Sequence, residues 1–143
     1  MVSSWLKRIG RWLRPSGRFS LGPKGERIAA NFLQGLGYRI IARGHRQKLG
    51  EIDLIAIDDN VLVFCEVKAW SHGIAGESAE AVNSKKQERL TRAALIYMKQ
   101  RGLLEHPARF DVIAISMDAP DNQPQIRHFK NAFEAVGRGQ MFR

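Results

Sequence analysis

Residues 50–68, with the sequence GEIDLIAIDDNVLVFCEVK, constrain the fold more than any other part of this chain. Two apolar runs, at residues 52–57 and 61–67, flank an Asp-Asp-Asn cluster at residues 58–60. Asp and Asn tolerate the left-handed backbone of a tight turn, so this pattern predicts a β-hairpin. Solvated hairpins alternate apolar and polar residues, whereas these strands are apolar on both faces, and we expect the hairpin to be central in its sheet.

The register of the hairpin follows if Asp59 and Asn60 form a two-residue loop. Like charges directly opposite each other destabilise a strand pair by up to ~1 kcal/mol, so opposed carboxylates need compensation. Residues two apart in a strand share one face of the pleat, which brings Lys68 to the side of Glu66. The predicted pairs are Ile57 with Leu62, Ile55 with Phe64, Asp53 with Glu66, and Glu51 with Lys68.

A convergent Asp, Glu and Lys suit phosphodiester hydrolysis. Carboxylate oxygens bind Mg²⁺, which usually keeps water and substrate phosphate as its other ligands. Such an ion polarises the phosphate and lowers the pKa of an attacking water, while a lysine stabilises the transition-state charge. The alternative is a surface hairpin whose Asp, Glu and Lys form a cross-strand ion pair, since Glu-x-Lys alone is common.

Seven segments follow one another in order between residues 25 and 133: GERIAANFL, GYRIIAR, GEIDLIA, LVFCEVKAW, AEAVNSKKQERL, RFDVIAI and IRHFKNAF. With this series the chain resembles the YraN-like family of small, poorly characterised proteins. It is more distantly similar to Holliday junction resolvases of the PD-(D/E)XK superfamily. The resemblance implies an α/β, restriction-endonuclease-like core, with a mixed central sheet of about five strands flanked by helices.

The resemblance also implies roles for individual residues. Asp53, Glu66 and Lys68 match the Asp and Glu-x-Lys of the superfamily core, with the two acids as ligands of Mg²⁺ or Mn²⁺. Glu26 matches the acidic residue of the first helix, a further metal ligand, although an acid there also favours the helix dipole. Gln87 matches the polar catalytic-site residue of the next helix, although a capping role at that helix's start explains it equally well.

The apolar periodicity predicts the remaining elements. We expect helices over residues 26–36 and from about 85 to before Gly102, and strands over residues 38–42, 109–117 and 125–128. A strand that follows a helix predicts a crossover with parallel pairing. Residues 43–48 are expected to form a basic loop that positions phosphates or is a solvated turn, residues 69–76 a loop, and residues 131–136 a short helix or coil.

Charge is unevenly distributed along the 143 residues, which carry a net charge of +9. Residues 1–25 hold six basic residues and no acid. The expected organisation is a basic amphipathic arm and linker at residues 1–24, a nuclease-like α/β domain at 25–136, and a tail at 137–143. A basic balance suits nucleic acid as a partner, and the single cysteine, Cys65, favours a reducing, cytoplasmic location.

The arm carries a stripe of apolar residues at helical spacing, which predicts a short helix stopped by Pro15. Three alternatives stand: it docks on its own domain or on a second copy in a homodimer, it contacts nucleic acid or a membrane surface, or it is frayed. It is too short to span a bilayer. The stripe consists of Trp5, Leu6, Ile9, Trp12 and Leu13.

These features predict a metal-dependent nuclease that acts on DNA, with branched or structured DNA included. The alternative is a non-catalytic nucleic-acid-binding or assembly module on the same fold. A protein that has lost its catalytic activity has no need to keep two opposed acids. An intact carboxylate cluster therefore favours the enzyme over the non-catalytic module.

Overall fold

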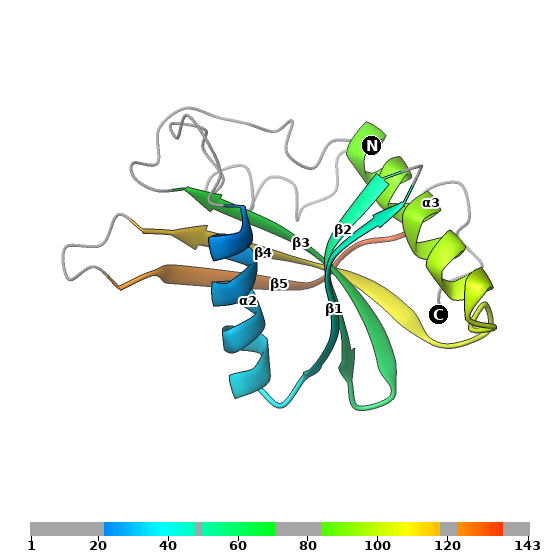
Figure 1. Cartoon of the computed structure of the whole chain (residues 1–143), viewed down its shortest axis with the longest axis horizontal. Coiled ribbons are helices and arrows are strands. Elements are labelled where there is room, and N and C mark those ends of the chain that lie inside the picture. The colour runs from blue at the N-terminus through cyan, green and yellow to red at the C-terminus, as the bar shows by residue number, and fades with distance from the viewer. Residues whose placement is uncertain (1–21, 48–49, 71–83, 118–122, 136–143) are drawn as a thin grey trace.

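The computed structural model describes residues 22–47, 50–70, 84–117 and 123–135. Residues 1–21 of the predicted arm, most of the predicted loop at 69–76 and the predicted tail lie outside these ranges. No helix in the described part is long and apolar enough to cross a membrane. The elements run in the order α2 (Pro23–Gly35), β1 (Arg39–Gln47), β2 (Gly50–Asp58), β3 (Val61–Trp70), α3 (Ser84–Gln100), β4 (Ala108–Ser116) and β5 (Gln125–Phe133) (Figure 1).

The five strands form one mixed sheet in the order β1-β2-β3-β4-β5. β3 and β4 pair in parallel, and the other neighbouring pairs are antiparallel. A parallel pair needs a crossover connection, and α3 lies in that connection between β3 and β4. The predicted hairpin is β2 with β3, and neither strand is at an edge of the sheet. The predicted α/β fold is therefore confirmed, and it is compatible with a restriction-endonuclease-like core.

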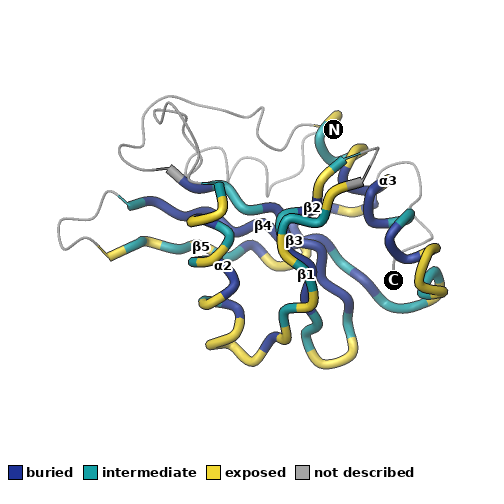
Figure 2. Tube along the Cα trace, in the orientation of Figure 1, coloured by how far each residue is buried: buried dark blue, intermediate teal, exposed yellow. Residues whose placement is uncertain are grey.

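Helices α2 and α3 pack in separate cores and, with the sheet between them, form three layers in the described part of the chain. α2 contributes Ala29 and Leu33 to a core that includes Ile113 of β4. α3 contributes Met98 and other apolar residues to a second core that includes Phe110 of the same strand. Because side chains of a strand alternate between its faces, the two cores lie on opposite sides of the sheet. Figure 2 shows buried residues gathered along β3 and β4, the middle of the molecule.

The hairpin turn has the two-residue loop expected from the sequence. Asp59 has a φ of 56°, the left-handed conformation that such a loop requires and that Asp tolerates. The predicted pairs Ile57 with Leu62 and Ile55 with Phe64 are both present. The register of this part of the hairpin is confirmed.

The sheet divides between β2 and β3 beyond the pair Leu54 with Cys65, where their ladder ends. β1 stays paired with β2 beyond this point, and β3 stays paired with β4. Figure 1 shows the divergence: β1 and β2 turn towards α3, whereas β3, β4 and β5 continue past α2. We call this divergence the fork. The predicted pairs of residue 53 with 66 and of 51 with 68 fall beyond the ladder, so that part of the predicted register is wrong.

The first strand is longer than the sequence indicated. Residues 43–47 continue β1, whereas a basic loop was expected there. They pair with the start of β2, from Gly50 to Leu54. A strand at the edge of a sheet tolerates arginines on its solvated side. The polar sequence of residues 43–47 was therefore compatible with a strand as well as with a loop. α2 also begins earlier than expected, at Pro23, because proline is well tolerated in the first turn of a helix.

The last strand also continues further than expected, to Phe133, where a short helix or coil was predicted. A register shift between Phe110 and Val112 of β4 accompanies a left-handed residue in β5, Asn131, with a φ of 51°. The Asn131 backbone N–H donates a 2.9 Å hydrogen bond to Asp111 Oδ1. This side-chain contact replaces a ladder bond at the bulge, so the strand resumes beyond it.

Candidate metal centre at the fork

Asp53 lies at the fork, where β2 leaves β3. Its neighbour Ile52 belongs to the core beneath α3, and Leu54 belongs to the core beneath α2. Asp53 Oδ2 accepts a 2.8 Å hydrogen bond from the backbone N–H of Val67 on β3. The carboxylate thus bridges two strands that no longer share a ladder, and this bond fixes its orientation.

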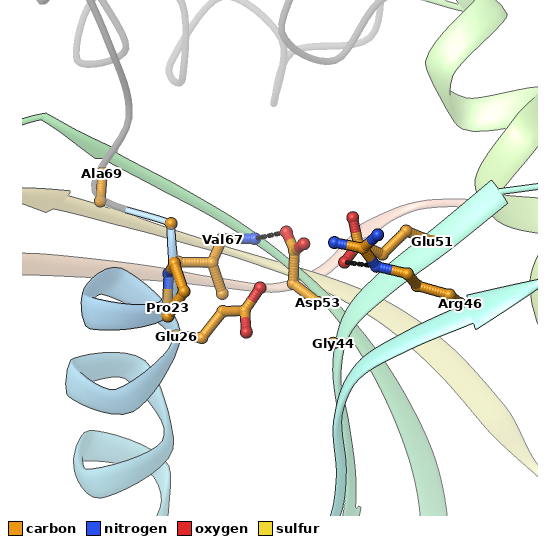
Figure 3. A pocket seen from close by; sticks show the side chains of 9 residues that line it. Pro23, Glu26, Gly44, Arg46, Glu51, Asp53, Val67 and Ala69 are labelled. Atoms are coloured by element: carbon orange, nitrogen blue, oxygen red, sulfur yellow. Dashed lines mark hydrogen bonds and ion pairs between the residues drawn. The ribbon is translucent and has the colours of Figure 1, made fainter.

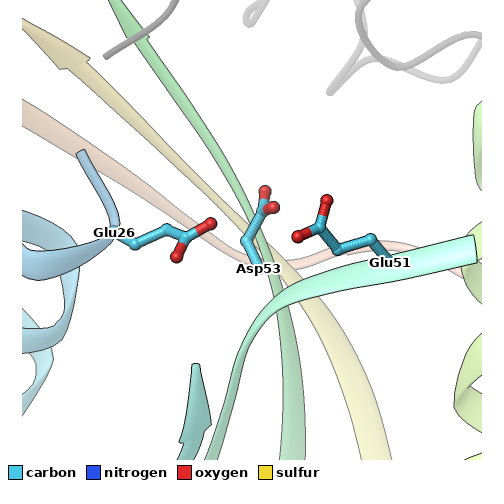
Figure 4. A group of neighbouring side chains, drawn as sticks. All are labelled: Glu26, Glu51 and Asp53. Atoms are coloured by element: carbon cyan, nitrogen blue, oxygen red, sulfur yellow. The ribbon is translucent and has the colours of Figure 1, made fainter. Parts of the chain in front are cut away.

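Three carboxylates converge at this point. Glu26 comes from the first turn of α2, and Glu51 and Asp53 come from β2. Each offers one oxygen within 4.8 Å of the others. Figure 4 shows Asp53 between the two glutamates, with all three side chains directed towards a common region. Glu51 and Asp53 both lie in the part of β2 beyond its ladder with β3.

A pocket of about 300 Å³ contains the carboxylate cluster (Figure 3). Arg46 carries the only positive charge among the described residues that line it, and its Nε lies 3.4 Å from Glu51 Oε2. The Arg46 side chain is 83% exposed and that of Glu51 is 41% exposed. The complete described lining is Gly22, Pro23, Glu26, Gly44, Arg46, Glu51, Asp53, Val67 and Ala69.

Gly44 of β1 forms the floor beside the carboxylates. A Cβ placed there would lie 3.5 Å from Glu26 Oε1 and 3.8 Å from Glu51 Oε2, so it would fill space next to both oxygens. The φ of Gly44 is +56°, a conformation that most residues with a side chain rarely adopt. Glycine therefore keeps the strand close to the cluster and leaves room beside it.

The donor set fits a hard divalent cation. Ligands at about 2.1 Å in an octahedron are about 3 Å apart when adjacent and about 4.2 Å apart when opposite. The cluster oxygens, within 4.8 Å of one another, need only small side-chain rotations to reach such spacings. All three donors are carboxylates, the ligand type that Mg²⁺ and Mn²⁺ prefer. The direct protein ligands of such an ion would therefore be Glu26, Glu51 and Asp53.

The electrostatics of the cluster are those of crowded acids. Burial raises the pKa of Asp53 to about 8, with the charge of Glu66 adding to the rise, while the Val67 hydrogen bond opposes it. Burial and the charge of Glu51 raise the pKa of Glu26, which the arginines of β1 partly oppose. A nearby cation would remove this penalty, because it favours the ionised carboxylates.

Glu66 lies on the α3 side of the fork and is paired with two lysines. Its Oε2 lies 3.4 Å from Lys68 Nζ and 3.3 Å from Lys86 Nζ. The Glu66 side chain is only 3% exposed, whereas the two lysines are partly exposed. A buried carboxylate needs such partners, since an unpaired one would be costly. The charge of Glu66 also contributes to the raised pKa of Asp53, so this acid acts on the cluster across the fork.

The residues proposed from the sequence therefore occupy two neighbouring groups. Asp53 and Glu26 lie in the carboxylate cluster, and Glu66 with Lys68 forms the adjoining ion-pair group. Gln87 is half-buried in the first turn of α3, where its backbone carbonyl accepts a 2.8 Å hydrogen bond from the Thr91 hydroxyl. It does not line the described pocket.

Three contributors were not assigned to the site from the sequence: Glu51, Arg46 and Lys86. Glu51 was expected opposite Lys68, and it lies instead in the carboxylate cluster with Asp53 and Glu26. Arg46 was placed in the basic loop expected at residues 43–48, and Lys86 was given no role. Their positions depend on how β1 and α3 pack at the fork, which no local pattern encodes.

A second polar group lies away from the pocket and is structural. Asp111 of β4 is fully buried and accepts hydrogen bonds from Arg109 Nε at 2.9 Å and from His128 Nε2 at 2.7 Å. Burial alone would raise the pKa of Asp111, but these bonds, with that of Asn131, outweigh it and lower the pKa. Arg109 also reaches Tyr38 Oη at 2.7 Å. This network joins β4 and β5 to the segment between α2 and β1.

The uncharacterised protein family UPF0102 matches this chain over residues 25–115. A UPF0102 protein of Geobacter sulfurreducens is 46% identical over 114 residues, covering 80% of this chain and 88% of its own length. Another, from Symbiobacterium thermophilum, is 47% identical over 115 residues, with coverages of 80% and 97%. A third, from Anaeromyxobacter dehalogenans, is 41% identical over 122 residues, with coverages of 85% and 90%. The matched region includes every residue of the pocket from Glu26 to Ala69.

Proposed function

We propose that this chain, which belongs to the uncharacterised protein family UPF0102, is a metal-dependent nuclease that hydrolyses phosphodiester bonds in DNA, branched or structured DNA included. One observation carries the proposal. Three carboxylates from two elements converge within 4.8 Å in one pocket, beside an acid that is paired with two lysines. Crowded acids cost folding energy, so their convergence favours a site that binds a cation.

Asp53, Glu51 and Glu26 would hold the ion, and Glu66, whose charge acts on Asp53, stays paired with Lys68 and Lys86 beside them. A bound Mg²⁺ or Mn²⁺ would polarise the phosphate and acidify a bound water. The hydrogen bond from the Val67 N–H keeps the Asp53 carboxylate in a fixed orientation at the fork. Pre-oriented groups of this kind contribute because they need no rearrangement during the reaction.

In this proposal Lys68 would stabilise the negative charge that develops on the phosphate. Its ammonium lies 3.4 Å from Glu66 Oε2, and its side chain is 25% exposed, so it is not sealed off from solvent. In hydrolysis the water oxygen forms a new bond to phosphorus, and one P–O ester bond breaks. The attacking water gives up a proton and the departing oxygen takes one, while the extra negative charge of the transition state falls on the phosphoryl oxygens, where Lys68 would offset it.

The nuclease proposal is tested with purified protein and labelled DNA, supplied as a duplex and as a four-way junction. Cleavage should require Mg²⁺ or Mn²⁺, and Asp53→Asn should reduce the rate by at least about 100-fold, as expected when a group of this kind is lost. Asp59→Asn is the matched control, because Asp59 lies in the exposed hairpin turn and asparagine accepts its left-handed φ. DNA binding without cleavage would instead support the non-catalytic module.

A further inference from the structure

Arg46 lines the pocket but has no role in the reaction proposed above. It is the only cation among the described residues lining the pocket, in which three carboxylates would otherwise repel any phosphate. It lies on β1, an edge strand of the sheet, and its side chain is 83% exposed. A guanidinium offers a planar set of donors that matches phosphate oxygens. Its position and chemistry both suit an anionic ligand at the mouth of the pocket.

The partner of Arg46 is one of the three clustered carboxylates. Arg46 Nε lies 3.4 Å from Glu51 Oε2, and Glu51 offers an oxygen to the cluster as well. Exposed ion pairs contribute only ~0.2–1 kcal/mol, so this contact is easily exchanged. A divalent cation bound to Glu51 would compete directly with Arg46 for that carboxylate. The arginine would then be available at the place where the phosphate enters.

We propose that Arg46 is a phosphate-binding residue that is held on Glu51 until a divalent cation takes the carboxylates, which couples cation binding to DNA binding. This inference rests on the proposed nuclease function and deepens it. The coupling is reciprocal: a cation that increases DNA affinity must itself bind more tightly when DNA is present. Arg46 is the side chain that carries this coupling.

The test uses Arg46→Gln and the matched control Arg43→Gln in the full-length protein. Arg43 lies on the same strand and influences Glu26 through its charge, but it is outside the described pocket lining. Mn²⁺ binding is measured by calorimetry without DNA. DNA binding is measured by fluorescence anisotropy with and without Mn²⁺, and a gel confirms that the probe is still intact.

Arg46→Gln should bind Mn²⁺ about threefold more tightly without DNA, because it no longer competes for Glu51. With Mn²⁺ present it should bind DNA about tenfold more weakly, the loss expected for a charge-assisted contact, and without Mn²⁺ less than twofold more weakly. Arg43→Gln should give equal, small losses in both conditions. Arg46→Lys, which keeps the charge and loses the planar donors, should be intermediate.

Several outcomes overturn the inference. Equal DNA losses with and without Mn²⁺, or the same behaviour in Arg43→Gln, would show a general charge effect. Unchanged Mn²⁺ affinity in Arg46→Gln would show that the pair does not compete with the ion. If the unsubstituted protein binds no Mn²⁺, the inference and the proposed function both fail. Intact coupling without DNA cleavage would support the role of Arg46 and overturn only the nuclease activity.

Discussion

The backbone N–H of Val67 donates a 2.8 Å hydrogen bond to Asp53 Oδ2 across the point where β2 and β3 separate. The bond holds a carboxylate in the fork, between the core beneath α2 and the core beneath α3. Glu26 and Glu51 meet Asp53 in the pocket, and Glu66 acts on it from the α3 side. The separation of two strands therefore creates the site.

The raised pKa of Asp53 predicts how stability depends on pH. Its pKa rises from 3.8 to about 8 on folding, so between these values the folded protein binds more protons than the unfolded chain. The free energy of unfolding should therefore fall as pH rises from about 4 to 8, and change little from this cause above 8. Asp53→Asn should flatten this dependence and stabilise the metal-free protein by on the order of 2 kcal/mol at pH 8.

Urea unfolding at several pH values, with EDTA present, measures the effect of Asp53. Asp59→Asn, on the exposed turn, should keep the pH dependence of the unsubstituted protein. A variant Asp53→Asn with the same slope as the unsubstituted protein would show that Asp53 is already ionised in the folded state.

Lys86 should stabilise the fold through the buried Glu66 carboxylate. Lys86→Met removes one of its two cationic partners and should lower the free energy of unfolding by about 1 kcal/mol, since Lys68 remains. Lys85→Met is the matched control, because Lys85 is the exposed preceding residue of α3, and a change within about 0.5 kcal/mol is expected. Equal effects of the two substitutions would contradict a specific role for the Lys86 contact.

Asp111 should matter for stability and not for the metal. Asp111→Asn breaks a fully buried network and should cost about 3 kcal/mol. Because the pKa of Asp111 is lowered on folding, its contribution is present above about pH 4, the unfolded value, and is lost as pH falls through the folded value. The variant should keep a rise in melting temperature on addition of Mn²⁺, whereas Asp53→Asn should lose it. Loss of that rise in Asp111→Asn would link the two polar groups.

The basic arm provides a prediction that concerns DNA affinity. Deletion of residues 1–21 removes five basic residues and leaves Gly22, whose carbonyl accepts the first hydrogen bond of α2. If the arm contacts phosphates, each lost contact should reduce the slope of log affinity against log salt by about 0.9 for duplex DNA. If it docks on the domain or on a second copy, stability or oligomeric state should change instead. Binding measured at several salt concentrations, together with sedimentation, distinguishes these outcomes.

The sequence predicted the parts of the fold that depend on local chemistry. Asp59 and Asn60 indicated the turn, and the turn set the register as far as the pair Leu54 with Cys65. The fork was not predictable in this way, because it depends on how β1 and β2 bend away from the rest of the sheet. The sequence therefore indicated that Asp53 and Glu66 lie near each other, but it did not indicate that their strands separate at the fork.

Two further features needed tertiary contacts. The arginine-rich end of β1 has the polar sequence of a loop, because an edge strand can remain polar. Its pairing with the start of β2 makes it a strand. The end of β5 resembled a helix or coil until Asp111 supplied a hydrogen bond to the Asn131 amide at the bulge. In both cases the deciding partner is distant in sequence, so no local pattern indicates it.

A crystal structure of the protein soaked in Mn²⁺ tests the metal centre most directly, because anomalous scattering locates the ion independently of any activity. We expect one anomalous peak in the fork, at about 2.1 Å from an oxygen of Asp53 and from at least one of Glu26 and Glu51. Arg46 should then no longer contact Glu51. A fork without an anomalous peak at millimolar Mn²⁺, with the Arg46 and Glu51 ion pair intact, would contradict the metal centre and the nuclease mechanism built on it.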